Sequence, residues 1–356
     1  MIPYRLTRLG IVMTPDPDDP LEAEGVLNPA CGHTPDGRLH LLARVVAAGN
    51  VSQVMLAEVV VDDGVPVGVE RRSIVLAPDM PWERGTNHGG VEDPRVTYID
   101  RLGLHVMTYV AFGPLGPRIA LAVSRDLMSW ERLGPIHFGY EPQWGIDFNL
   151  YPNKDALFFP EPIIGPGGEP CYAMLHRPMW GANWLGLGDE LPPPAGIDER
   201  LGIWISYANA ATVDADPRRL TALASHQCVA NGEFPFESTK IGGGPPPIRV
   251  PEGWLLIHHG VEGEVDTSFD PSLSNSATYR AGALLLDPAD PSRVLDRTAE
   301  PMLEPETAGE RVGTVANVVF PTAIADIGDR QFVFYGMADA RIGVAELERT
   351  ATGALR

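Results

Sequence analysis

A pair of adjacent carboxylates, Glu92 and Asp93, is the first feature that could do chemistry. Positions 90–95 read Gly-Val-Glu-Asp-Pro-Arg, so the pair stands two residues before Arg95. We expect a turn that leads into a strand, because Pro94 cannot donate to an inner ladder. The plain interpretation is a turn pinned by one ion pair, with Arg95 as the partner of either carboxylate. The functional interpretation is a carboxylic acid at the mouth of a channel.

Basic side chains stand at the ends of several apolar segments. Arg44 ends one such segment and Lys154 opens another. An arginine at the end of an apolar strand is costly unless it is paired or faces a ligand. Lys154 is also compatible with a solvated strand start, and His259 with a core histidine bonded to a backbone carbonyl. His258 and His259 cannot ligate one ion, since successive side chains of a strand point to opposite faces, and we expect no metal site.

The charge of the chain limits its partners. Twenty-seven basic residues stand against 47 acidic ones, a formal net charge of −20, with 44% hydrophobic and 21% charged residues. This composition is globular, and the negative charge disfavours binding to nucleic acid or to anionic membranes. An anion site in this chain must therefore be a local basic cluster.

The cysteine content and the lack of long apolar runs indicate the cellular compartment of the protein. The cysteine count is odd and there is no Cys-x-x-Cys spacing, so a disulfide framework or a zinc site is not expected. The apolar stretch at 9–13 is too short for a signal peptide, and no run reaches membrane-spanning length. We expect a soluble cytoplasmic protein. The sequence leaves open whether copies of the chain form a homo-oligomer.

Short β-type runs separated by glycine and proline turns recur along the whole chain, which predicts an all-β fold. One pattern, a polar loop followed by an apolar strand, appears five times and predicts a five-bladed β-propeller in which residues 1–356 form a single domain. An inserted loop around 180–197 is interpreted equally as a spacer or as a lid. The predicted strands are 39–46, 53–61, 104–111, 118–123, 156–159, 171–175, 202–207, 253–258, 281–286, 318–324, 331–335 and 342–347.

Ten motifs in a fixed order resemble glycoside hydrolase family 130, the β-mannoside phosphorylases and related β-mannosidases. Each motif alone is weak, but together they run from Asn28 to Ala345. The resemblance implies a five-bladed propeller with the sugar site on its central axis. The motifs occupy positions 28–29, 41–44, 90–95, 154–161, 174–178, 242–248, 253–261, 285–294, 317–322 and 338–345.

The resemblance assigns roles residue by residue. Asp93 matches the family's general acid, which is thought to pass its proton through the sugar 3-hydroxyl in an inverting reaction. Such an acid must be neutral when the bond breaks, so we expect burial or the neighbouring Glu92 to raise its pKa. The implied phosphate-binding residues, expected on the face opposite Asp93, are Arg44, Lys154 and His259, with Arg118 and Arg177 as looser candidates.

The implied sugar-binding residues are Asn28, Glu92, Asp155, Phe320 and Asp339. Trp254 is interpreted either as a stacking platform or, more commonly for tryptophan, as part of the core. No cofactor is expected, because inorganic phosphate serves as the second substrate.

Three functions are compatible with these residues. The leading one is an inverting phosphorylase that cleaves a β-mannooligosaccharide or a mannosyl-glucose with phosphate to give α-mannose 1-phosphate. The first alternative is an inverting β-mannosidase, with Glu161, Glu233 or Asp147 as the base that activates water. The second is a non-catalytic sugar-binding propeller. The linkage and the acceptor sugar stay open.

Overall fold

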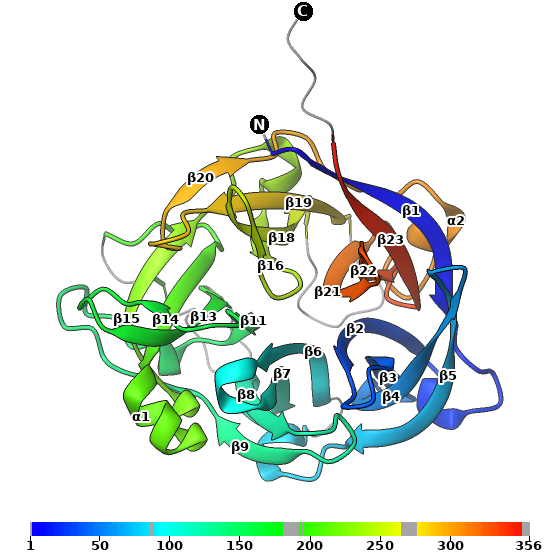
Figure 1. Ribbon diagram of the computed structural model, residues 1–356, viewed down its shortest axis with the longest axis horizontal. Coiled ribbons are helices and arrows are strands. Elements are labelled where there is room, and N and C mark those ends of the chain that lie inside the picture. The colour runs from blue at the N-terminus through cyan, green and yellow to red at the C-terminus, as the bar shows by residue number, and fades with distance from the viewer. Residues whose placement is uncertain (1, 86–88, 181–191, 194–195, 265–275, 351–356) are drawn as a thin grey trace, which may run out of the picture.

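The computed structural model describes residues 2–85, 89–180, 192–193, 196–264 and 276–350. Within these ranges the protein is almost entirely β-structure, and its sheets are arranged as a ring (Figure 1). This is the all-β, propeller-like architecture that the sequence predicts. In the described part of the chain, no helix is both long and apolar enough to cross a membrane.

The strands form groups that run outward from the centre of the ring (Figure 1). The innermost strands are β2 (Gly25–His33), β6 (Gly89–Ile99), β11 (Asn153–Phe158), β16 (Lys240–Gly243) and β21 (Val319–Ile327). Central strands are β3 (Leu39–Ala47), β4 (Val51–Asp62), β7 (Leu104–Gly113), β8 (Gly116–Ser124), β13 (Pro170–Pro178), β14 (Ile203–Asn209), β18 (Gly253–Glu262), β19 (Thr278–Leu286), β22 (Arg330–Met337) and β23 (Arg341–Arg349). Peripheral strands are β5 (Val65–Leu76), β9 (Glu131–Pro135), β15 (Ala222–Ala230), β20 (Val294–Arg297) and β1 (Tyr4–Met13), with the short β10 (His137–Phe138), β12 (Ile163–Ile164) and β17 (Ile248–Val250) beside them.

Hydrogen bonding joins these groups into four sheets. Three have the orders β1-β23-β22-β21, β16-β18-β19-β20 and β10-β15-β14-β13-β11. The fourth, of eight strands, has the order β2-β3-β4-β6-β7-β8-β9, with β5 paired to β4. Its halves meet through a short parallel pairing of β4 with β6, which joins Val51 to Gly89 and Ser52 to Gly90. The largest sheet is therefore two antiparallel groups in light contact.

Each innermost strand is preceded by a short helix. These helices are η1 (Pro20–Glu22), η2 (Pro81–Glu83), η4 (Phe148–Leu150), η6 (Pro235–Glu237) and α2 (Ala308–Arg311). In four of them a glutamate at or near the end is fully buried: Glu22, Glu83, Glu237 and Glu310. Each of these carboxylates accepts hydrogen bonds from an arginine, and from a backbone N–H in the segment that leads into its helix. The same turn thus positions the inner strand in successive groups. The remaining short helices are η3 (Asp100–Leu102), η5 (Pro217–Thr221) and α1 (Ala210–Ala215).

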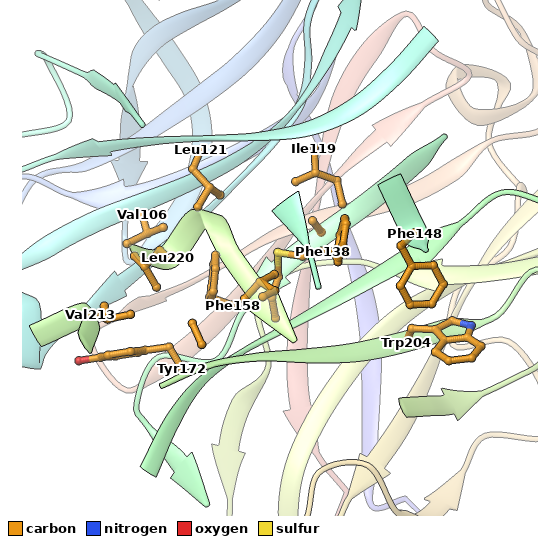
Figure 2. Packing of buried hydrophobic residues seen from close by; sticks show 14 of the residues in the cluster. Val106, Ile119, Leu121, Phe138, Phe148, Phe158, Tyr172, Trp204, Val213 and Leu220 are labelled. Carbon is orange, nitrogen blue, oxygen red and sulfur yellow. The ribbon is translucent and has the colours of Figure 1, made fainter. Parts of the chain in front are cut away.

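Apolar clusters fill the spaces between neighbouring groups. Figure 2 shows one of them, where Val106 and Leu121 of β7 and β8 face Phe158, Tyr172 and Trp204 of the next group. Four further clusters join the other neighbouring pairs, including β3 and β4 with β22 and β23. Because each group buries a face against both neighbours, the groups depend on one another for stability.

The predicted strands are confirmed, since all twelve fall on observed strands. The innermost strands β2, β6 and β16 were not recognised. The prediction of a turn for the Glu92–Arg95 segment is wrong, because it lies inside β6. A register shift between Glu92 and Arg95 forms a bulge there, which removes the need for Pro94 to donate to the ladder. The predicted loop at 180–197 lies mostly outside the described residues.

The two ends of the chain close the ring. β1 pairs antiparallel with β23, with Tyr4 opposite Arg349. Glu310 strengthens this closure, because its carboxylate accepts from Arg8 Nε of β1 at 2.8 Å and from the Tyr335 hydroxyl of β22 at 3.0 Å. One buried carboxylate thus links the first strand to the last group.

Glu310→Gln is expected to destabilise the protein by about 2–4 kcal/mol, since the change leaves Arg8 Nε and the buried Tyr335 hydroxyl without a charged acceptor. Denaturant unfolding of the purified variant measures the loss. Glu306→Gln is the matched control, because Glu306 pairs with the same Arg8 from a side chain that is 60% exposed. That control should lie within about 1 kcal/mol of the wild type. Equal stability of the two variants would contradict the closing role of Glu310.

Candidate active site

Three acidic or amide side chains project from bulges in consecutive inner strands. Asn28 of β2, Asp93 of β6 and Asp155 of β11 have φ of 42°, 46° and 56°. Each lies within a register shift between its strand and the adjacent one. A left-handed conformation is unfavourable for residues other than glycine, and bulges re-aim side chains near functional sites. The repeated geometry indicates that the inner strands are shaped to present these groups.

The first cluster of the site surrounds Asp93. Arg44 donates from Nη1 to Asp93 Oδ1 at 2.9 Å and from Nη2 to Glu92 Oε1 at 3.0 Å, while its Nε donates to Ser52 Oγ at 2.8 Å. Asn28 Nδ2 donates to Asp93 Oδ1 at 2.8 Å. All these side chains are buried or nearly so. Arg44 is thus held rigidly, with each of its three nitrogens hydrogen-bonded.

Lys154 completes the first cluster. Its Nζ lies 3.4 Å from Glu92 Oε2 and 3.8 Å from Asp93 Oδ2. Burial by itself raises the pKa of Asp93, but the charges of Arg44 and Lys154 outweigh it and hold the pKa well below its usual range. The expectation of a raised pKa is wrong for the free protein, because cations adjoin this carboxyl in addition to Glu92. Asp93 is therefore ionised until something offsets these charges.

The second cluster surrounds Asp155. Arg177 Nε donates to Asp155 Oδ2 at 2.7 Å, and His259 Nε2 lies 3.5 Å from the same oxygen. Burial raises the pKa of Asp155, but Arg177 and His259 outweigh it and hold the pKa well below its usual range. Burial lowers the pKa of His259 far below its usual value, so that the ring is neutral. Phe320 packs against His259 with ring centres 4.4 Å apart.

Two arginines behave differently from the prediction. Arg95 was expected to pair with Glu92 or Asp93, but it donates instead to the backbone oxygens of Gly244 and Asp93, both at 2.8 Å. It therefore fastens β6 to the glycine segment after β16. Arg118 donates to the oxygen of Pro117 at 3.3 Å and forms no ion pair with another described residue. The structure does not bring Arg118 into either cluster.

Asp339 lies in the turn between β22 and β23 and has a φ of 47°. Burial raises the pKa of Asp339 to about 6; Arg44 opposes this shift and Asp93 adds to it. The site thus holds two carboxyl groups with opposite shifts, one ionised at Asp93 and one that retains a proton to near neutrality at Asp339. Such a difference is typical of sites that move protons.

Two residues near the second cluster were missed from the sequence. Tyr279 of β19 lies with its ring centre 6.2 Å from that of His259. Lys240 of β16 places its Nζ 5.4 Å from the Tyr279 ring centre. No motif signal pointed to Tyr279. Lys240 had one signal, since it is one of only two lysines in the chain, and that signal was not used.

A buried hydrogen-bond chain supports the strands that carry Lys154 and Arg177. His226 Nε2 lies 2.8 Å from the Gly139 oxygen, which makes this nitrogen the donor and leaves Nδ1 to accept from Ser206 Oγ at 2.8 Å. Ser206 therefore accepts from His176 Nε2 at 2.7 Å, and His176 Nδ1 accepts from Asn153 Nδ2 at 3.0 Å. Both histidines must be neutral for this chain to persist, which agrees with the lowering of their pKa by burial.

The three candidate bases for a hydrolase lie outside both clusters. Glu161 is exposed, and Glu233 is an exposed partner of Arg297 at 2.9 Å. Asp147 accepts from the backbone N–H of Asn149 and caps η4. Trp254 is 1% exposed and packs against Phe159 in the core, so its stacking interpretation is wrong. Among the described residues, no group of His, Cys, Asp or Glu is arranged to hold a metal ion.

Comparison with known proteins identifies the family. The family model of glycoside hydrolase family 130, described as beta-1,4-mannooligosaccharide phosphorylase, matches residues 18–351. The chain therefore belongs to glycoside hydrolase family 130.

Individual relatives are similar over most of their length. A beta-1,2-mannobiose phosphorylase of Thermoanaerobacter sp. is 32% identical over 97% of this chain and 98% of the relative. A 1,2-beta-oligomannan phosphorylase of the same organism is 35% identical over 76% of this chain and 72% of the relative. The solved structure of the Listeria innocua beta-1,2-mannobiose phosphorylase with beta-1,2-mannobiose has a TM-score of 0.59 at 25% identity, covering 97% of this chain and 86% of that chain.

Asp339→Asn is expected to stabilise the protein near neutral pH. The pKa of Asp339 is raised to about 6 in the folded state, whereas an unfolded aspartate titrates near 4. The folded state therefore binds more protons between about pH 4 and 6, and stability falls as the pH rises through this window, by roughly 1–3 kcal/mol in total. A neutral asparagine removes this penalty.

Melting temperatures of wild type and Asp339→Asn across this pH range give the test. The variant should melt several degrees higher at about pH 7.5, with the gap shrinking toward pH 4. A gap that does not depend on pH would contradict the raised pKa.

Proposed function

We propose that this protein is an inverting β-mannoside phosphorylase, which uses inorganic phosphate to cleave a β-mannooligosaccharide or a mannosyl-glucose. The observation that carries the proposal is the concentration of buried or half-buried cations around the inner strands of a strongly acidic chain. Arg44, Lys154 and Arg177 adjoin Asp93 and Asp155. The named activities of the relatives support the same reaction class. Such cations suit a phosphate oxyanion, whereas a water nucleophile does not need them.

The reaction balances with this chain's residues in defined roles. An oxygen of phosphate attacks C1 of the mannosyl unit from the face opposite the leaving group, and the C1–O bond breaks with inversion. The leaving oxygen receives a proton that originates on Asp93 and passes through the sugar 3-hydroxyl. The products are α-mannose 1-phosphate and the shortened acceptor. Asn28, Glu92, Asp155, Phe320 and Asp339 are the proposed sugar-binding residues.

The electrostatics of the site determine when the Asp93 carboxylate gains a proton. In the free protein Arg44 and Lys154 hold the pKa of Asp93 well below its usual range. A bound phosphate dianion offsets these positive charges, which raises the pKa of Asp93 and favours its protonated form. We therefore propose that the acid gains its proton only when the second substrate is present, which limits wasteful hydrolysis.

The number of blades and the domain organisation belong to the same proposal. We propose five blades, namely β2–β5, β6–β9, β11 with β13–β15, β16 with β18–β20, and β21–β23 with β1. The five short helices before inner strands and the five apolar clusters between groups support this count. Residues 1–356 then form one catalytic domain that needs no cofactor besides phosphate. The proposal includes a cytoplasmic location.

Phosphate dependence of wild-type turnover tests the proposal. Purified protein is incubated with β-1,2- and β-1,4-mannobiose and with mannosyl-glucose, with and without phosphate, and the products are separated. We expect α-mannose 1-phosphate with phosphate and negligible mannose without it. Mannose released at equal rates in both conditions would instead identify a hydrolase, and sugar binding without turnover would identify a binding module.

Asp93→Asn is expected to lower turnover by about 100-fold or more while the variant still binds the mannoside, because the proton donor is removed and its shape is kept. Calorimetric titration with substrate measures the retained binding. Glu233→Gln is the matched control, since Glu233 is exposed and pairs only with Arg297 among the described residues. It should keep wild-type turnover. Loss of activity in the control and not in Asp93→Asn would refute the assignment.

A further inference from the structure

The third group of strands, β11 with β13–β15, is held together differently from the other four groups. In those four, the buried glutamate of the helix before the inner strand accepts a hydrogen bond from an arginine of the outermost strand. A charged pair of this kind persists until its carboxylate is protonated, which for an ordinary glutamate occurs near pH 4. The four pairs are Glu22 with Arg71, Glu83 with Arg132, Glu237 with Arg297 and Glu310 with Arg8.

The third group has two histidines and a serine where the others have a charged pair. Its helix η4 contains no glutamate. His176 of β13, Ser206 of β14 and His226 of β15 are hydrogen-bonded in series at 2.7 and 2.8 Å, and each is at most 1% exposed. Among the described residues, neither histidine pairs with a carboxylate. Phe148 of η4 packs against both imidazole rings instead, with ring centres 5.3 and 4.9 Å away.

This histidine chain ends at the bulge that carries Asp155. The register shift of β11 leaves Asp155 and Ala156 opposite the single residue His176 of β13. His176 Nδ1 also accepts from Nδ2 of Asn153, the first residue of β11, at 3.0 Å. Because a bulge re-aims the side chain that it carries, the contacts that hold the bulge also set the direction of Asp155.

The bulge that carries Asp93 has a charged support in the same place. Tyr109 of β7 stands opposite that bulge, and its hydroxyl donates to the buried Glu83 at 2.7 Å. His176 has the equivalent position in the third group, but its partner is a neutral serine. An imidazole in water gains a proton near pH 6.5. The support of the Asp155 bulge is therefore open to disruption in weak acid.

We propose that His176, Ser206 and His226 are positioning residues for the Asp155 bulge, and that proton uptake by this chain releases the bulge in weak acid while the rest of the ring stays folded. His176 donates through Nε2 and accepts through Nδ1, so a second proton removes the acceptor of Asn153. A proton on His226 removes the acceptor of Ser206 in the same way. The kinetic consequence, a reversible loss of turnover below about pH 6, rests on the proposed phosphorylase function.

The surroundings of the chain favour its neutral form. Burial lowers the pKa of His176 well below its usual value and also lowers that of His226, and each ring disfavours a proton on the other. Glu141 and Asp147, which precede η4, favour a proton on His226, but burial outweighs them. The elements β7, β8, β10 and η4 contribute apolar side chains such as Phe138 to the same cluster. The stability that the neutral chain supplies is therefore fully present above about pH 6.5 and is lost as the pH falls below it.

Hydrogen exchange of the backbone amides tests the proposal, with protection factors that correct for the intrinsic effect of pH on exchange. If opening lets the histidines titrate near 6.5, the opening equilibrium rises between pH 7.5 and 5 by about 30-fold for one histidine and about 1,000-fold for two. We expect the protection of β11 and β13 to fall by an amount in this range. The strands β21–β23 contain no histidine and are the internal reference. Their protection should fall at least tenfold less.

Replacing both histidines separates protonation from hydrogen bonding. His176→Gln combined with His226→Gln keeps a donor and an acceptor at each position but cannot be protonated. This double variant should match the wild type at about pH 7.5, lose the acid response of β11 and β13, and show a shallower fall of kcat/KM below pH 6. Ser206→Ala breaks the chain at every pH, so it should lower the protection of β11 and β13 already at pH 7.5.

His105→Gln is the matched control. His105 is 5% exposed at the start of β7, and burial lowers its pKa to about 4, but it lies outside the chain. In this variant β11 and β13 should respond to acid as in the wild type. The proposal is overturned if protection of β11 and β13 in the wild type falls no more than that of β21–β23, or if the double variant keeps the full acid response. Exchange alone gives both results, so they are distinct from failure of the phosphorylase function, in which the wild type releases mannose without phosphate.

Discussion

The buried contact between Arg44 and the adjacent carboxylates Glu92 and Asp93 is the interaction on which the rest of the site depends. Removing such charges from water costs several kcal/mol for each ion, and the cost is offset only if every partner stays in place. Arg44, Ser52 and Lys154 supply those partners. The same contacts that make burial tolerable also keep Asp93 ionised. An anion that enters beside these cations therefore changes both the charge of the site and the protonation of its acid.

The fold produces this arrangement by repetition. A short helix with a buried glutamate precedes most inner strands, and a bulge within β2, β6 and β11 then turns Asn28, Asp93 and Asp155 out of the regular strand geometry. Apolar packing between neighbouring groups holds the inner strands in position, so the strained conformations persist. Close approach of backbone to side chain adds to this: a Cβ on Gly336 would lie 2.1 Å from Asn28 Oδ1. The packing that stabilises the ring therefore also fixes the geometry of the site.

The sequence predicted the parts of the structure that follow from apolar periodicity. Central strands such as β7 and β22 alternate or run apolar, and they were found with nearly correct bounds. Of the inner strands, β2, β6 and β16 were missed, because glycine, polar or charged residues interrupt their apolar pattern. Their burial also depends on partners far away in the chain, as for Arg95 and Gly244. Motif order singled out Asp93, Arg44 and Lys154, but it placed the two cations on the face opposite Asp93, whereas both lie beside its carboxylate. The low pKa of Asp93 could not be predicted, since it arises from contacts between different strands.

Protonation of Asp93 is the quantity that tests this account most directly. Difference infrared spectroscopy of the wild type against Asp93→Asn isolates the signal of this carboxyl group, in the free protein and with saturating sulfate. The account predicts an ionised carboxylate in the free protein down to about pH 4, and an apparent pKa that rises when the anion binds. A protonated carboxyl band at about pH 6 in the free protein, unchanged by sulfate, would contradict it.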